Sequence, residues 1–138
     1  MKYQKQKDNT YVIRIERGEE IVNSLTKFCK SNKIGGGFFF GVGAVGKLTL
    51  AHYSVGKKKY NEKKFNEPLE MASLNGSVGV EKDLIIHAHG VFADKNMQTV
   101  AGHVVSARVS GTAEIYLIKL PKLKKIYDPG TGLKIFDL

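Results

Sequence analysis

Three of the four histidines in the chain lie within one stretch, residues 84–110. His87 and His89 are two residues apart in an apolar run that is typical of a β-strand, so their side chains share one face. The residues between and around them are apolar and supply the opposite, core-facing side. His103 follows a short polar turn and begins a second apolar run. Pairing of the two runs would bring His103 close to the other two histidines.

Three imidazoles that converge from strands can bind zinc and leave a fourth coordination position open. Zinc held there would polarise a carbonyl group or activate water. We therefore predict a metal site, with zinc as the cofactor, at His87, His89 and His103. Glu70 and Glu114 are candidate acid or base groups beside it. The alternative is that the three histidines are half-exposed polar residues bonded to backbone or water.

A second chemistry is indicated by the most basic part of the chain, residues 55–68. Tyr60 and Phe65 alternate there with lysines, and such rings can stack on bases while lysines contact phosphates. The predicted nucleic-acid-binding residues are Lys57, Lys58, Lys59, Lys63 and Lys64. The 22 lysines and arginines exceed the 13 acidic residues, and the net charge of +9 favours polyanions. The alternative is a solvated hairpin tip whose lysines protect an edge strand.

Length and composition restrict the class of protein. The 138 residues are expected to form a single domain, 1–138, with its own core. No apolar run reaches the roughly 18 residues of a membrane span, and the polar N-terminus does not resemble a secretory signal. The only cysteine, Cys29, cannot form an internal disulfide and fits a reducing compartment. We therefore expect a cytoplasmic protein.

The elements that position these residues are mostly strands. Glu19 and Glu20 open one helix with a stripe of apolar residues, which glycines 35–37 should end, and we expect it to be the only long helix. Alternating runs separated by tight turns predict seven to nine strands, with a final short strand at residues 134–136. The predicted fold is α+β: a mostly antiparallel β-sheet with one long helix packed on it.

A glycine-rich segment, residues 41–46, has the spacing of a dinucleotide-binding fingerprint. That fingerprint must open a helix, but residues 47–54 alternate as a strand. We therefore reject a nucleotide site and predict a bulge or bend where backbones approach closely.

The order of several short motifs resembles the PPC domain (plants and prokaryotes conserved domain) over about residues 11–120. The motifs are Gly18-Glu19-Glu20, Gly41-Val42-Gly43-Ala44-Val45, Glu67-Pro68-Leu69-Glu70, Ser73-Leu74-Asn75-Gly76, His87-Ala88-His89, Gly102-His103 and Thr112-Ala113-Glu114-Ile115. The resemblance implies an α/β fold, in the family's description, with an antiparallel sheet and a homotrimer. The domain is also similar in fold to acetolactate decarboxylases, which hold zinc through a His-x-His pair and a further histidine, as His87, His89 and His103 would.

In plants the PPC domain follows AT-hook motifs in nuclear DNA-binding proteins, and this chain lacks the Arg-Gly-Arg-Pro core of that motif. The resemblance therefore implies a homotrimeric protein that binds or associates with DNA with little sequence preference. One alternative is a zinc-dependent enzyme that acts on a small carbonyl compound. The other is a trimeric protein-interaction module.

Overall fold

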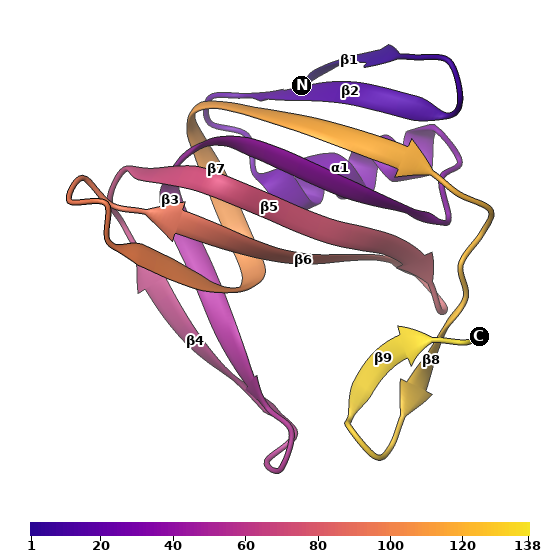
Figure 1. The fold of residues 1–138 in the computed structure, drawn as a ribbon. Coiled ribbons are helices and arrows are strands. Elements are labelled where there is room, and N and C mark those ends of the chain that lie inside the picture. The colour runs from indigo at the N-terminus through magenta and orange to yellow at the C-terminus, as the bar shows by residue number, and fades with distance from the viewer.

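The chain folds into nine strands and one helix, as the alternating sequence predicts (Figure 1). The computed structural model describes residues 1–138. In chain order the elements are β1 (Lys2–Lys5), β2 (Thr10–Glu16), α1 (Ile21–Ser31), β3 (Gly37–Ser54), β4 (Lys59–Phe65), β5 (Leu69–Val80), β6 (Leu84–Ala93), β7 (Thr99–Lys119), β8 (Lys125–Asp128) and β9 (Leu133–Phe136). The predicted antiparallel α+β class is confirmed.

Seven strands form one sheet in the order β1-β2-β7-β6-β5-β3-β4, and every named pairing is antiparallel. β7 also pairs with β3, so β3, β5, β6 and β7 close on themselves. The two longest strands make this possible, because each bends and pairs with different partners along its length (Figure 1). The edge strands β1 and β4 carry exposed polar side chains, which protect a sheet edge from further pairing.

The helix lies behind the sheet in Figure 1 and buries its apolar stripe against it. The prediction of a long helix is wrong, because α1 spans only 11 residues. Glu20 lies outside the helix as its N-cap, accepting hydrogen bonds from the backbone N–H groups of Val22 and Asn23. The other end stops before the predicted glycines, since Lys33 adopts a left-handed φ of 52°.

The glycine-rich segment lies inside β3, and the predicted bulge is confirmed. The pairing register with β7 shifts between Gly43 and Val45 and again between Val45 and Lys47. Residues 110–111, Ser and Gly, belong to β7, which continues through them without a break. They lie at the bulge, between the pairs Val45–Val109 and Gly43–Ala113, and these flanking pairs keep the segment extended.

A continuous apolar core of 24 buried residues lies between the helix and the sheet. Phe39 is 1% exposed, and its ring occupies the space that Gly76 leaves open on β5. A Cβ atom added to Gly76 would lie 2.2 Å from the Phe39 ring and 2.4 Å from the carbonyl oxygen of His87. This glycine therefore allows close packing directly beneath the histidine strand.

The C-terminal hairpin, β8 and β9, forms a separate two-stranded sheet beside the main one (Figure 1). The predicted final strand is thus present, although the sequence did not show where the hairpin would pack. The single helix is neither long enough nor apolar enough to cross a membrane.

Candidate metal centre

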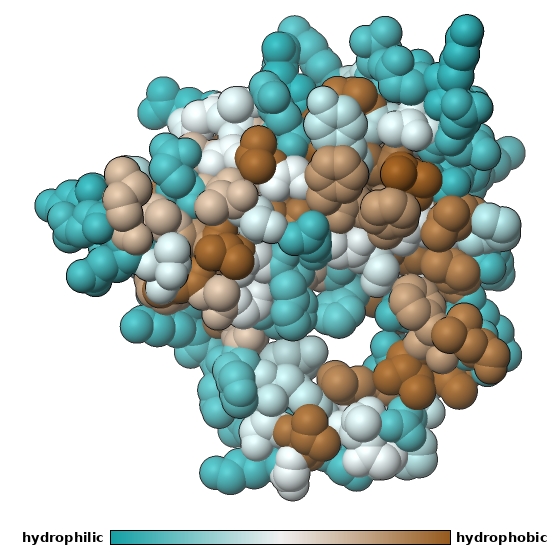
Figure 2. Space-filling model, viewed as in Figure 1, coloured by the Kyte–Doolittle hydropathy of each residue, from teal (hydrophilic) through white to brown (hydrophobic).

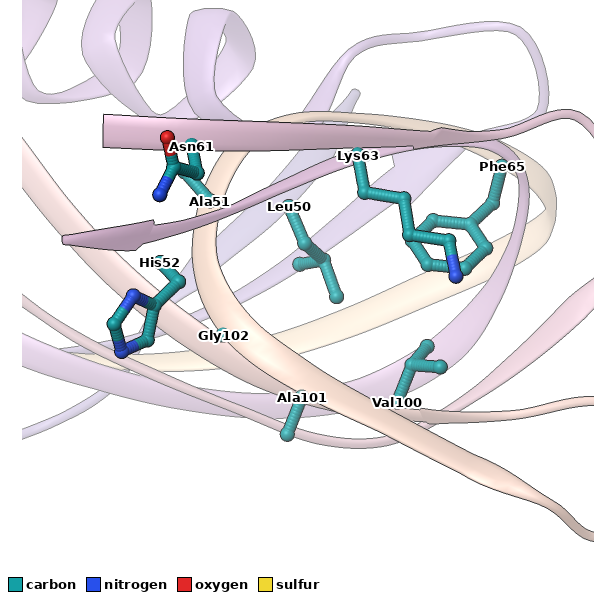
Figure 3. Close-up of a pocket in the computed structure, with 9 residues that line it drawn as sticks. All are labelled: Leu50, Ala51, His52, Asn61, Lys63, Phe65, Val100, Ala101 and Gly102. Carbon is teal, nitrogen blue, oxygen red and sulfur yellow. The ribbon is translucent and has the colours of Figure 1, made fainter. Parts of the chain in front are cut away.

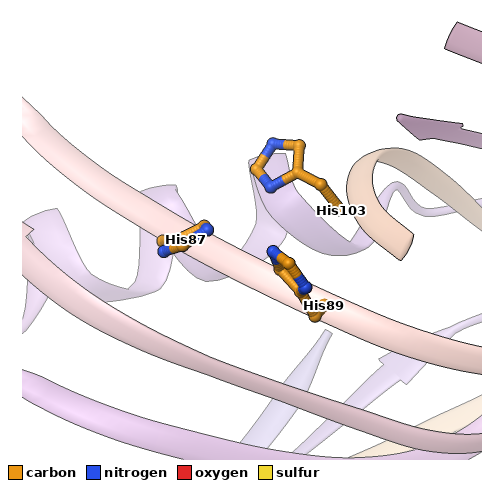
Figure 4. A group of neighbouring side chains, drawn as sticks. All are labelled: His87, His89 and His103. Carbon is orange, nitrogen blue, oxygen red and sulfur yellow. The ribbon is translucent and has the colours of Figure 1, made fainter. Parts of the chain in front are cut away.

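Strand β6 presents two histidines on the face turned away from the core. Ala88 and Phe92 alternate with them and are 2% and 0% exposed, so the core side of β6 is fixed by burial. His89 pairs directly with His103 of β7 in the antiparallel register. Figure 4 shows His87 and His89 rising from one strand toward His103, which comes from the neighbouring strand. The structure therefore brings the three predicted histidines together.

The three rings are close enough to share one ion. Each offers a nitrogen, and these nitrogens lie within 4.8 Å of one another. The ring centroids are 5.1 Å apart for His87 and His89, 5.2 Å for His87 and His103, and 5.5 Å for His89 and His103. A tetrahedral zinc holds its nitrogen ligands roughly 3.4 Å apart, as bond lengths of about 2.0–2.1 Å require. Small rotations of the rings would bring the nitrogens to that spacing.

An unpartnered polar atom supports this fit. The Nδ1 atom of His103 is buried and has no hydrogen-bond partner. Such an atom costs free energy in the folded state unless a partner is supplied. A metal ion coordinated by the three imidazoles is one such partner, and neutral imidazole suits zinc.

The local electrostatics keep two of the three histidines neutral. Burial first, and then the neighbouring charges of His103, His89 and Lys125 in that order, lower the pKa of His87 to about 4. Burial, followed by the charge of His89, also lowers the pKa of His103. Both rings are therefore unprotonated near neutral pH, which is the form that coordinates metals.

A cavity of about 1030 Å³ opens over the histidines. Figure 2 shows the hollow between the main sheet and the C-terminal hairpin. The lining residues include hydrophobic side chains from β6 and β9, and none of them is acidic. Glu70 and Glu114, the candidate acid or base groups, are exposed and do not line this cavity. The structure thus places neither carboxylate at the histidines.

Two tyrosines and a lysine at this site were not found from the sequence. The Tyr60 ring packs 5.0 Å from the His103 ring and 4.7 Å from that of Tyr53. Burial, followed by the effect of Tyr53, raises the pKa of Tyr60, so its hydroxyl stays protonated and can donate a hydrogen bond. Lys125 from β8 is 4% exposed, and burial lowers its pKa. The alternation of side chains along β4 sets which face of the strand Tyr60 lies on, but only the folded structure shows that this face lies against His103.

The five predicted nucleic-acid-binding lysines are all exposed, on the edge strand β4 and the turn before it. Lys63 and Lys64 point to opposite faces of β4, because neighbouring strand residues alternate. Lys58 donates a hydrogen bond to the carbonyl oxygen of Pro129, at 2.5 Å. The lysines therefore surround the hairpin tip rather than forming one flat patch.

A second, smaller cavity of about 350 Å³ lies on the other face of β4 (Figure 3). Lys63 extends over the Phe65 ring there, with its Nζ atom 5.1 Å from the ring centroid. His52 lies at one end of this cavity, also lines the larger cavity over the histidines, and is exposed.

Known proteins share this fold over nearly the whole chain. A candidate DNA-binding protein from Bacteroides thetaiotaomicron is 32% identical with a TM-score of 0.95, over 99% of this chain and 96% of that one. Another candidate DNA-binding protein, from Ralstonia eutropha, is 27% identical with a TM-score of 0.91, over 99% and 95%. A metal-containing protein from Archaeoglobus fulgidus has the same fold, with 24% identity and a TM-score of 0.89, over 100% and 99%.

No curated protein matches the chain at a significant level. Residues 2–121 match the Plants and Prokaryotes Conserved (PCC) domain, which is the PPC domain that the motifs resemble. Because this match spans most of the 138 residues, the chain belongs to the Plants and Prokaryotes Conserved domain family.

Proposed function

We propose that the protein binds one divalent transition metal per chain, zinc, through His87, His89 and His103, and acts on a small carbonyl compound in the cavity above them. The observations that carry this proposal are the convergence of one nitrogen from each of three histidines within 4.8 Å and the buried, unpartnered Nδ1 atom of His103. The metal-containing relative from Archaeoglobus fulgidus shows that a protein of this fold contains a metal.

The residues around the site have distinct roles in this proposal. Zinc, when bound, would supply a Lewis acid that polarises a carbonyl oxygen. The three imidazoles bind in their neutral form, and the Tyr60 ring packs against His103 and limits its rotation. The Tyr60 hydroxyl is a protonated donor at the cavity wall. Because no carboxylate lines the cavity, a general base would have to come from elsewhere or from the bound water.

Zinc loading followed by desalting and elemental analysis tests this proposal. The wild-type protein should retain about one zinc per chain, as three imidazole ligands allow. The His87→Ala and His103→Ala variants should each lose most of it while staying folded. His52→Ala is the matched control and should retain the metal, because His52 is not part of the cluster. Full retention by either cluster variant would contradict the assignment.

We infer a second function, association with DNA with little sequence preference, from the charge and from two relatives. The net charge is +9, and exposed lysines surround the β3–β4 tip. The relatives from Bacteroides thetaiotaomicron and Ralstonia eutropha are named as candidate DNA-binding proteins. A mobility shift with long duplex DNA at low salt should weaken steeply as salt is added, since counterions are released on binding. The absence of any shift at low salt would exclude this function.

We also propose a homotrimer, supported by apolar side chains on the sheet face turned away from α1 (Figure 2). Phe40 and Tyr116 stack there at 5.3 Å and are 44% and 45% exposed, with Phe38 and Val42 beside them on β3. Burial of this surface between copies would be favourable. Light scattering should give three times the chain mass of 15.3 kDa, and a mass of one chain at micromolar concentration would contradict the trimer.

A further inference from the structure

The C-terminal hairpin is a fixed wall of the histidine cavity. It lies outside residues 2–121, which match the family domain, yet it supplies Lys125 and several residues of β9 to the lining. On one side, the Tyr53 hydroxyl donates to the carbonyl oxygen of Thr131 at 2.7 Å. On the other side, Lys134 forms an ion pair with Glu81 at 2.7 Å. The hairpin therefore bridges the cavity from the β3–β4 tip to the end of β5.

Lys125 enters the cavity from this wall with most of its donors unused. Its aliphatic stem packs over Gly79, where an added Cβ would lie 2.9–3.1 Å from three of its carbon atoms. Its Nζ atom lies 4.0 Å from the Phe136 ring centroid and donates one hydrogen bond, at 3.4 Å, to the carbonyl oxygen of Lys134. An ammonium group has three donors, and no carboxylate forms an ion pair with this one.

A buried ammonium group without a partner anion destabilises a fold, and a bound anionic ligand would supply that partner. The cavity offers no anion of its own, since none of its lining residues is Asp or Glu. A metal ion on three neutral imidazoles would add further positive charge to the same space. Charge complementarity thus requires the ligand to be negative.

The shape and the remaining lining indicate which kind of anion fits. A single ammonium matches a single carboxylate, whereas phosphate sites usually combine arginines or several backbone N–H groups. The walls on the hairpin side include Leu133, Ile135 and Phe136, which suit an apolar or aromatic body. We propose that Lys125 is the anion-binding residue of this cavity and that the ligand is a small organic carboxylate. This inference rests on the proposed function, because it names the ligand class of the same site.

Calorimetric titration of the zinc-free and the zinc-loaded full-length protein tests this inference. The three probes are phenylacetate, its neutral analogue phenylacetamide, and inorganic phosphate. Phenylacetate should bind both forms of the wild type more tightly than either of the other two probes. Lys125→Met, which keeps the aliphatic stem, should weaken phenylacetate binding at least about tenfold, as expected for a charged hydrogen bond. Lys125→Gln is a second variant that retains a polar end. Lys124→Met is the matched control and should change nothing, because Lys124 is exposed and pairs with Asp137.

Thermal unfolding separates binding from a structural role. The ligand-free Lys125→Met protein should unfold at the same or a higher temperature than the wild type, because an unpaired buried charge has been removed. A clear decrease for both variants would make Lys125 a structural residue and overturn the inference. Equal phenylacetate binding by wild type and Lys125→Met, or equal affinity for phosphate, would also overturn it. If the wild-type protein binds phenylacetate through Lys125 but does not bind zinc, only the proposed metal site is refuted.

Discussion

Replacement of His103 by phenylalanine should make the zinc-free protein more stable while it removes the response to zinc. His103 has a buried Nδ1 atom without a hydrogen-bond partner, and such an atom costs about 1–3 kcal/mol. Phenylalanine has a similar shape, lacks this atom and can pack against Tyr60, whose ring lies 5.0 Å away. We therefore expect His103→Phe to raise the free energy of unfolding by about 1–2 kcal/mol when a chelator removes all metal.

Zinc should reverse this order of stability, so that the wild type becomes more stable than His103→Phe. A ligand at 100 times its Kd stabilises the folded state by about 2.7 kcal/mol, so the wild type gains this amount and the variant does not. Urea unfolding, with chelator and then with zinc, measures both quantities. His52→Phe is the control, because His52 is exposed. In chelator its free energy of unfolding should stay within about 0.5 kcal/mol of the wild-type value, and zinc should stabilise it as much as the wild type. A zinc-free His103→Phe that is about 1 kcal/mol less stable than wild type would refute the reasoning, as would an undiminished zinc gain.

Three other predictions follow from the fold and the site. In zinc-free protein the His87 ring should titrate near pH 4 by NMR. The free energy of unfolding should fall as the pH is lowered from about 6.5 to 4, because His87 of the unfolded chain takes up its proton at a higher pH than His87 of the folded protein. A ring that titrates near pH 6.5 would contradict the burial argument. Gly76→Ala should destabilise the fold by about 1–3 kcal/mol in chemical denaturation, because its Cβ would collide with Phe39; an unchanged midpoint would show that the strands can separate there. Glu20→Ala should lower the free energy of unfolding by about 1–2 kcal/mol, because the Glu20 carboxylate accepts hydrogen bonds from two helix N–H groups and, at 2.8 Å, from the backbone N–H of Ala107. Glu20→Gln should lower it less, and equal losses for the two variants would contradict the capping role.

The histidine cluster could be predicted because two local rules agree with the tertiary fold. Strand alternation placed His87 and His89 on one face, and burial of Ala88 and Phe92 enforces it. The short turn after β6 returned the chain as β7, which set His103 opposite His89. The orphaned Nδ1 atom and the spacing of the rings depend on packing and could not be derived from the sequence.

Other features were mispredicted or missed because tertiary contacts override local signals. Residues 110–111 have residue types typical of a turn, but the pairs that flank them, Val45–Val109 and Gly43–Ala113, carry β7 through this point. The helix is shorter than predicted because Glu20 caps it from outside and Lys33 turns the chain before the glycines. Lys125 belongs to a lysine-rich run and could not be distinguished from its exposed neighbours, since its burial depends on the space over Gly79.

X-ray absorption at the zinc edge of the zinc-loaded protein tests the central claim most directly, because it reports the atoms bound to the metal. The structure predicts three imidazole nitrogens and one exchangeable oxygen at about 2.0–2.1 Å. His103→Ala should lose one imidazole contribution or fail to retain the metal. A sulfur ligand at about 2.3 Å, fewer than two imidazoles, or a His103→Ala spectrum identical to the wild type would contradict the proposed metal centre.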